Sequence, residues 1–114
     1  MREYRALRKD NGEWVYGCLW KCSAYHDWNI KEMEGLEYSF EVKSETIGQF
    51  IGLKDKNLNK IFEGDIVKHH NFGIGQVEWD SYECKYKVNW RNKQITHSIL
   101  HLKLGEIIGN IHEN

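Results

Sequence analysis

The chain has 114 residues, enough for one domain of ordinary size and too few for two full hydrophobic cores. Its 16 basic and 17 acidic residues give a formal net charge of -1, which argues against a duplex-binding protein with a global basic excess, although a local patch stays open. The 3 cysteines do not resemble a secreted disulfide framework. No apolar run approaches the ~18 residues that span a bilayer. We therefore expect a cytoplasmic protein without a membrane partner.

The first 53 residues predict a hairpin and two further strands. Residues 10–12 (DNG) are a strong turn signal, and the aromatic run that follows predicts that residues 3–20 form a hairpin. Both faces of its second strand are apolar, so we expect both to be covered. Residues 21–35 lack a clear period and predict a loop with at most one helical turn. Residues 36–43 alternate cleanly and 46–53 are a short apolar run, so each predicts a strand.

The second half predicts further strands. Gly64-Asp65 before Ile66-Val67 is typical of a strand start in small barrels. Residues 72–75 (FGIG) predict a glycine-rich bend. The strand that contains Val77 and Trp79, the polar turn 80–83 and the alternating residues 84–90 then predict the clearest hairpin of the chain. Residues 94–104 predict a strand and a short helical turn, and 106–111 a closing strand. Seven to nine strands indicate an all-β fold, either barrel-like or built of two sheets, with SH3-like features in the C-terminal half.

Four segments together resemble the YopX family, whose members are small proteins of phages and prophage regions. They are residues 8–17 (RKDNGEWVYG), 46–57 (TIGQFIGLKDKN), 60–67 (KIFEGDIV) and 107–114 (IIGNIHEN). The resemblance implies a single YopX-like domain over residues 1–114, with an N-terminal β lobe of about 1–53 and a C-terminal β lobe of about 60–114. It implies a phage or prophage setting in a bacterial host cell, but no reaction, catalytic residue or cofactor. Leu58 departs from the family, which tends to have glycine there, so the turn type is in doubt.

Metal and catalytic sites have weak support in the sequence. Cys18, Cys22 and His26 are spaced by four and would share a helix face, but Cys18 lies in a strand-like run, so whether the three converge stays open. The adjacent His69 and His70 should point to opposite faces of a strand. The pair His97 and His101 lacks the glutamate of a metalloprotease helix. The simpler interpretation is thiols and histidines without a metal, and we expect no cofactor.

Two acids, Glu63 and Asp65, would share a strand face and could hold Mg²⁺ with a third carboxylate that the sequence does not place. The alternative is structural: Gly64 permits the turn, and Asp65 accepts hydrogen bonds from turn amides.

The strongest candidate for binding is a polar strip along the predicted strand 84–91. Its members are Lys85, Lys87, Asn89, Arg91 and Lys93. Beside tryptophans, such a strip could bind single-stranded nucleic acid, and the basic N-terminus (Arg2, Arg5, Arg8 and Lys9) could extend it. The alternative is a solvated face or a protected strand edge.

The tryptophans divide into two groups. Trp14, Trp79 and Trp90 alternate in strands and are expected in the core. Trp20 and Trp28 flank the irregular segment and are candidate binding anchors, although burial in the core is the simpler interpretation for each of them.

Three functions follow from these observations, in decreasing order of support. The first is a non-enzymatic binding module for single-stranded nucleic acid or for a phage or host protein. The second is a structural or assembly protein that forms a homo-oligomer through exposed strand edges. The third is a small metal-dependent nucleic-acid hydrolase.

Overall fold

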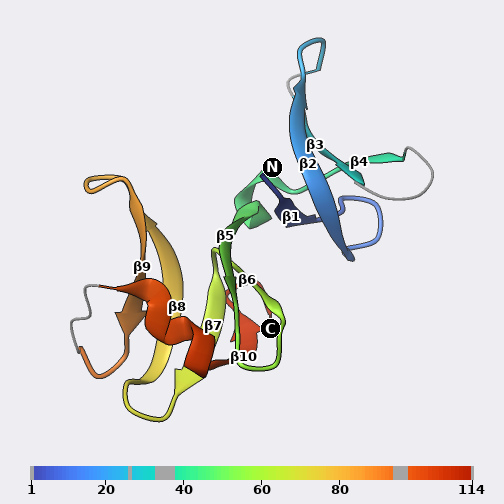
Figure 1. Cartoon of the computed structure of the whole chain (residues 1–114). Coiled ribbons are helices and arrows are strands. Elements are labelled where there is room, and N and C mark those ends of the chain that lie inside the picture. Colours follow the sequence, from blue (N-terminus) through green and yellow to red (C-terminus); the bar gives the residue numbers. More distant parts are fainter. Residues whose placement is uncertain (1, 26, 33–37, 94–97, 114) are drawn as a thin grey trace. The chain divides into compact units, whose positions relative to one another are not determined.

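The computed structural model describes residues 2–25, 27–32, 38–93 and 98–113. These residues form ten strands and two short 3₁₀ helices, and the strands make two antiparallel sheets (Figure 1). The all-β prediction with a short helical turn is therefore confirmed, and of the two architectures left open the described residues show two sheets. Contacts along the chain divide it into two compact units, Met1–Phe50 and Ile51–Asn114.

The N-terminal unit is an antiparallel sheet with the strand order β4-β3-β2-β1-β5. Its elements are β1 (Tyr4–Leu7), β2 (Trp14–Cys22), β3 (Asp27–Glu32), β4 (Ser39–Glu41), η1 (Ser44–Thr46) and the beginning of β5 (Gly48–Lys54). The Asp-Asn-Gly turn joins β1 to β2 as the sequence predicted, and Gly12 supplies its left-handed residue with φ of 71°. The main chain beyond β1 meets the end of β4 through a bridge between Arg8 and Val42.

The strand β3 corrects the sequence analysis, which assigned residues 21–35 to a loop. Six consecutive residue pairs join it to β2, from Gly17 and Glu32 to Cys22 and Asp27. Only Trp28 and Ile30 give this strand an apolar face, so its sequence signal is short, and the pairing with β2 supplies the rest. The partner strand β4 is shorter than the predicted 36–43: residues 36 and 37 lie outside the described residues, and Val42 forms only an isolated bridge with Arg8.

Small aliphatic side chains form the core of the N-terminal unit. The fully buried members are Ala6, Val15, Ile30 and Val42, and Leu19, Trp28 and Phe40 pack partly buried around them. All of these side chains from β1 to β4 share one face of the sheet, because cross-strand partners project to the same side. The opposite face of β2 therefore points away from the core.

The C-terminal unit contains the end of β5 and a sheet with the order β10-β7-β8-β9. Its elements are β6 (Lys60–Phe62), β7 (Asp65–His69), β8 (Gly73–Asp80), β9 (Lys85–Trp90), η2 (Ile99–Leu104) and β10 (Glu106–Asn110). The predicted hairpin is confirmed, with six register pairs between β8 and β9. The SH3-like character of this half stays a prediction.

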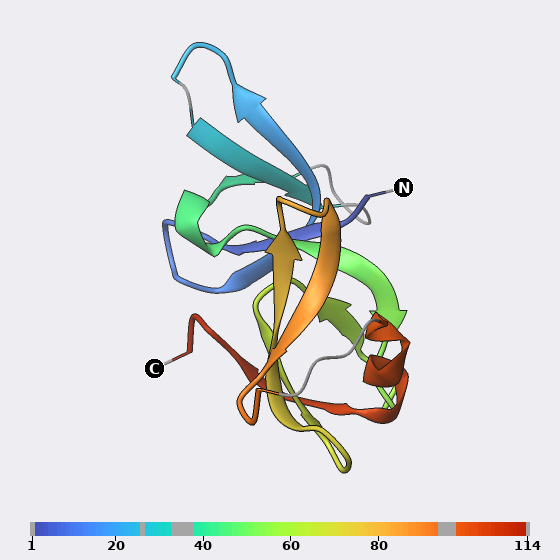
Figure 2. The same cartoon turned by 90° about the vertical axis from the view of Figure 1, so that its left-hand side faces the viewer.

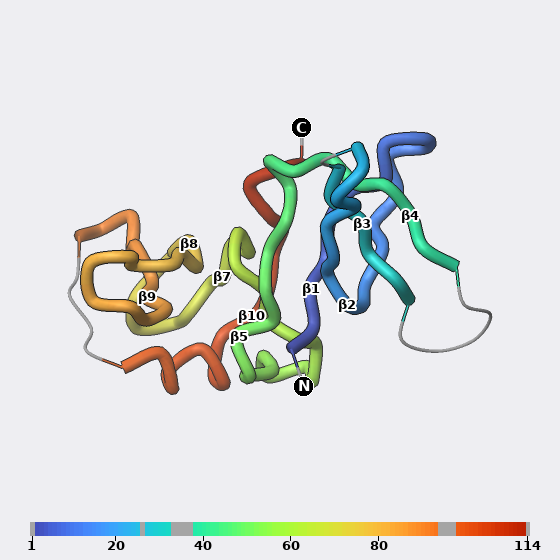
Figure 3. Tube along the Cα trace, turned by 90° about the horizontal axis from the view of Figure 1, so that it is seen from above, coloured from blue at the N-terminus to red at the C-terminus, as the bar shows by residue number. Residues whose placement is uncertain are grey.

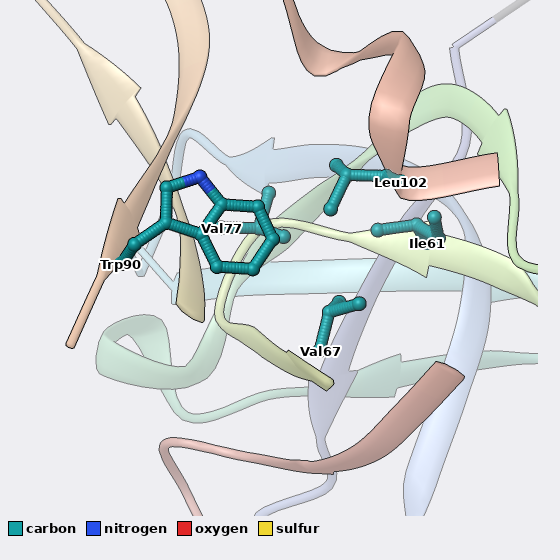
Figure 4. Packing of buried hydrophobic residues seen from close by; sticks show 5 residues of the cluster. All are labelled: Ile61, Val67, Val77, Trp90 and Leu102. Atoms are coloured by element: carbon teal, nitrogen blue, oxygen red, sulfur yellow. The ribbon is translucent and has the colours of Figure 1, made fainter. Parts of the chain in front are cut away.

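Trp90 is the largest buried side chain of the second core, which also contains Ile61, Val67, Val77 and Leu102 (Figure 4). The ring fits because Gly75 faces it on β8: a Cβ atom at Gly75 would lie 2.6 Å from Cε3 of Trp90. The described residues thus form two small clusters of buried side chains, where the chain length led us to expect one core.

Residues 99–105 show why their apolar pattern has no strand period. A 3₁₀ helix has three residues per turn, so Ile99, Leu102 and Gly105 share one face. Leu102 and Gly105 are buried, whereas Leu100 and Leu104 are 59% and 62% exposed. Figures 2 and 3 both show the end of η2 beside the turn between β5 and β6, where the amide of Lys56 donates to the carbonyl of Gly105 (N to O 3.0 Å).

Candidate functional site

The predicted basic strip lies on β9 and faces acidic residues of β8. Lys85, Lys87 and Asn89 are exposed and pair in register with Asp80, Glu78 and Gln76. The Lys87 ammonium lies 3.6 Å from Asp80, and the Lys85 ammonium lies 3.0 Å from Glu83. Cross-strand partners share a face, so Asp80 and Glu78 lie beside the two lysines, and Glu83 of the turn adds a third carboxylate through its ion pair with Lys85. This mixture lowers the positive potential that a phosphate backbone would require.

The turn that follows Asp80 stabilises the ionised form of this carboxylate beside the strip. Its Oδ1 accepts hydrogen bonds from the amides of Glu83 and Tyr82, at 3.1 and 2.9 Å. These two bonds, with the nearby Lys87, lower the pKa of Asp80 below its ordinary value. Arg91 and Lys93 follow β9 in the next turn, where Lys93 adopts a φ of 61°.

Three of the basic N-terminal residues, Arg5, Arg8 and Lys9, contact partners within their own unit. Arg8 forms a two-point contact with the carboxylate of Asp10, and Lys9 lies 2.7 Å from Glu41. The guanidinium of Arg5 is 4.6 Å from the ring centre of Trp14, and Arg5 is only 6% exposed. The structure therefore gives these residues local roles and does not support their use as an extension of the strip.

The two candidate tryptophans lie on opposite faces of the N-terminal sheet. Trp20 is 42% exposed, and its indole donates to the hydroxyl of Ser39 (2.8 Å). Trp28 is half-buried against the core, with the ammonium of Lys21 at 5.3 Å from its ring centre. Of these two tryptophans only Trp20 presents its ring on the outer face, so the structure does not bring them together.

An outer row of side chains on β2 is the feature that the sequence analysis missed. Tyr16 and Trp20 are 45% and 42% exposed, Cys18 between them is exposed, and half-buried Trp14 begins the row. The expectation that both faces of this strand are covered was therefore wrong. The sequence shows the alternation along β2. The other face, with Val15, Gly17 and Leu19, is equally apolar, so the alternation could not show which face is buried.

A second exposed aromatic group lies on the β8–β9 hairpin. Trp79, which we expected in the core, is 45% exposed and contacts Tyr86 edge to face, with ring centres 4.9 Å apart. It lies on the core-facing side of β8, but two residues beyond Val77, where the hairpin extends past the packed part of the unit. Tyr82 in the connecting turn is 95% exposed.

The acidic pair at the β6–β7 turn has a structural arrangement. The buried carboxylate of Asp65 accepts a hydrogen bond from the amide of Phe62 (2.8 Å), and Gly64 has the positive φ, 94°, that the turn requires. Burial raises the pKa of Glu63. In the part of the chain that the structure describes, no three His, Cys, Asp or Glu side chains come close enough to hold a metal ion.

The cysteine and histidine spacings do not produce clusters of the expected kind. Cys18 and Cys22 are both free and four residues apart on one strand, about 13 Å in extended backbone. Their possible partner His26, like His97, lies outside the described residues. The rings of His69 and His70 stack at 4.7 Å, so the expectation that they point to opposite faces was wrong.

His69 is buried among aromatic rings at the end of β7. It is 3% exposed, and the rings of Phe72, Trp90 and His101 have their centres at 4.7, 6.2 and 6.3 Å from its own. Its Nδ1 accepts from the amide of Asn71 (3.0 Å), which places the proton of the neutral ring on Nε2. Burial, and then the neighbouring His70 and His101, lower the pKa of His69.

Comparison with known proteins identifies the family. No curated protein matches the chain. None of the helices in the described ranges has the length and apolar character needed to cross a membrane. A family model described as YopX protein matches residues 3–114, nearly the whole chain, so the protein belongs to the YopX family.

Proposed function

We propose that this chain is a non-enzymatic binding module that holds a protein partner on the outer face of β2. The observation that carries the proposal is the exposure of Tyr16 and Trp20, 45% and 42%, on the face of a strand whose opposite face is the core. Tyrosine and tryptophan are the side chains most enriched among interface anchors, because they bury large areas at little cost in conformational entropy.

The surroundings of this row favour a protein over a nucleic acid. Lys31 lies opposite Cys18, and the Lys9–Glu41 ion pair lies at the β4 end of the sheet. An aromatic centre with polar groups of both signs around it is typical of a protein interface. A single-strand binding groove would combine its rings with a continuous run of cations, and the two basic segments of this chain pair with carboxylates instead.

The resemblance to YopX proteins implies a phage or prophage setting for the partner. We therefore propose a phage or host protein in the bacterial cytoplasm as the partner.

Matched tryptophan variants test this proposal. Partner capture from host lysate is compared for the wild-type chain, the double variant Tyr16→Ala and Trp20→Ala, and the control Trp79→Ala, which removes an equally exposed ring from the other unit. The proposal is supported if the wild-type chain and the Trp79→Ala control capture the same partner protein and the double variant does not. Equal capture by all three proteins contradicts it.

Titration with a single-stranded oligonucleotide distinguishes the nucleic-acid alternative. The protein-binding proposal predicts no quenching of tryptophan fluorescence at low salt. Quenching that weakens steeply with added salt would assign a nucleic-acid partner instead.

A further inference from the structure

The turn between β5 and β6 holds an apolar side chain in solvent. Leu58 is 76% exposed and has a φ of 66°, a conformation that glycine favours and leucine rarely adopts. Oδ1 of buried Asp55 accepts from the amides of Asn57 and Asn59, both at 2.9 Å, and fixes the turn. The turn thus keeps the backbone of a glycine-containing turn and presents leucine on it.

The helix η2 places two further exposed leucines near this turn. The amide of Lys56 donates to the carbonyl of Gly105, and Oδ2 of Asp55 accepts from the amide of Ile107 (3.0 Å each). Gly105 directly follows Leu104, so these bonds tie the C-terminal end of η2 to the turn. Leu100 and Leu104 are the exposed leucines of the helix, since its period directs Leu102 to the core.

Exposed lysines flank these leucines in the sequence. Lys54, Lys56, Lys60 and Lys103 are all exposed. Two acids lie in the same segments: Asp55 is buried and accepts from three amides, and Glu106 forms an ion pair with Lys56 at 3.8 Å, so lysines outnumber carboxylates there. Hydrogen bonds from the three amides outweigh the effect of burial and lower the pKa of Asp55. We call this group the leucine–lysine surface; it comprises Lys54, Lys56, Leu58, Lys60, Leu100, Lys103 and Leu104.

We propose that the leucine–lysine surface docks an acidic, amphipathic segment of a partner protein, with the leucines taking its apolar side chains and the lysines its carboxylates. The surface contains no aromatic ring, so it offers no stacking platform for bases. Surfaces that lie on a membrane typically add tryptophan or phenylalanine, which are also absent from this group. The site belongs to the C-terminal unit and goes beyond the proposed function of β2.

A titration of the isotope-labelled full chain with a designed peptide tests the site. The probe is an amphipathic peptide of about 20 residues, built of leucine and glutamate, and its control has lysine in place of glutamate. We expect amide shifts at residues 54–60 and 100–106 with the acidic peptide only. Leu58→Gly, which keeps the turn, should weaken binding about tenfold, the effect of losing one buried leucine. Lys54→Gln with Lys103→Gln should weaken it and reduce its salt dependence.

The matched control variant is Lys85→Gln with Lys93→Gln, which makes the same charge change on β9 and in the turn after it, outside the leucine–lysine surface, and should bind as the wild type does. Absence of binding at millimolar peptide, equal loss in this control, or shifts centred on β2 or β9 would overturn the proposal. Binding to anionic phospholipid vesicles that depends on Leu58, without binding to the peptide, would assign a membrane surface instead. Trp20→Ala should leave the peptide affinity unchanged, so this site and the β2 site fail separately.

Discussion

The two units use their tryptophans in opposite ways. The N-terminal core consists of alanine, valine and isoleucine, and Trp20 lies outside it, whereas the C-terminal core is built around Trp90, which is 2% exposed. Both residues lie in strands whose side chains alternate between two faces. Burial therefore depends on what faces each ring. Gly75 on the neighbouring strand leaves room for Trp90 in the core. On β2 the glycine, Gly17, lies on the core side, and Trp20 projects from the opposite, outer side. An aromatic residue left outside a complete core is available for binding.

Removing each indole in turn should give the largest contrast between the units. Trp90→Ala is expected to destabilise the protein by about 3–5 kcal/mol, because it leaves a cavity among Ile61, Val67 and Val77. Trp20→Ala should cost about 1 kcal/mol, since it loses partial burial and one hydrogen bond. Urea unfolding followed by circular dichroism measures both. Equal losses would show that the outer face of β2 is packed in solution.

A close backbone approach in the N-terminal unit gives the next largest effect. A Cβ atom at Gly17 would lie 2.0 Å from the carbonyl oxygen of Lys31, so Gly17→Ala must separate β2 from β3. We expect a loss of about 2–3 kcal/mol, comparable to overpacking in a core. Hydrogen exchange should show it as faster exchange of β3 amides, with the C-terminal unit unaffected.

Gly12 is the matched control for this change. Nothing lies within 4 Å of the position its Cβ would take, so Gly12→Ala carries only the strain of its positive φ, about 1 kcal/mol. An equal effect of the two substitutions would show that the close approach at Gly17 is unimportant.

Elements with a regular pattern were predictable from the sequence, whereas exposure was not. The β8–β9 hairpin follows from strict alternation around Asp80, which accepts from two turn amides. The strand β3 was missed because its apolar face has two residues and depends on pairing with β2. Alternation also placed Trp79 and Trp90 on one face, but it could not show that the hairpin extends beyond the core before it reaches Trp79.

The candidate surfaces were less predictable than the fold. The sequence places lysines on β9, but the ion pairs with Asp80 and Glu83 depend on strand register and turn geometry. The leucine–lysine surface joins residues from two segments more than forty positions apart, through bonds such as that from Ile107 to Asp55. A departure from the family pattern at Leu58 was the one signal of this surface in the sequence.

The buried histidine should make the C-terminal unit the pH-sensitive one. The pKa of His69 is lower in the folded chain than its ordinary value of 6.5, so the unfolded chain binds a proton first. Stability is complete above pH 6.5 and should fall as the pH drops below that value, until the folded-state pKa is reached. Thermal unfolding between pH 7.5 and 5 measures the slope. His69→Phe should reduce it, and a variant with the full slope would assign the effect to another group.

The smallest effect is expected at two turns that share one backbone conformation. Gly12 in the N-terminal unit and Leu58 in the C-terminal unit have φ values of 71° and 66°, but only one is glycine. Leu58→Gly should therefore stabilise the chain by up to about 1 kcal/mol, because relief of the left-handed strain exceeds the added freedom of the unfolded state. Leu58→Ala removes the side chain without relieving the strain and should leave stability nearly unchanged. Urea unfolding of both variants separates the two contributions. A higher free energy of unfolding in the alanine variant would mean that the exposed leucine side chain itself is unfavourable. A higher free energy of unfolding in the glycine variant alone would mean that leucine at this position strains the turn.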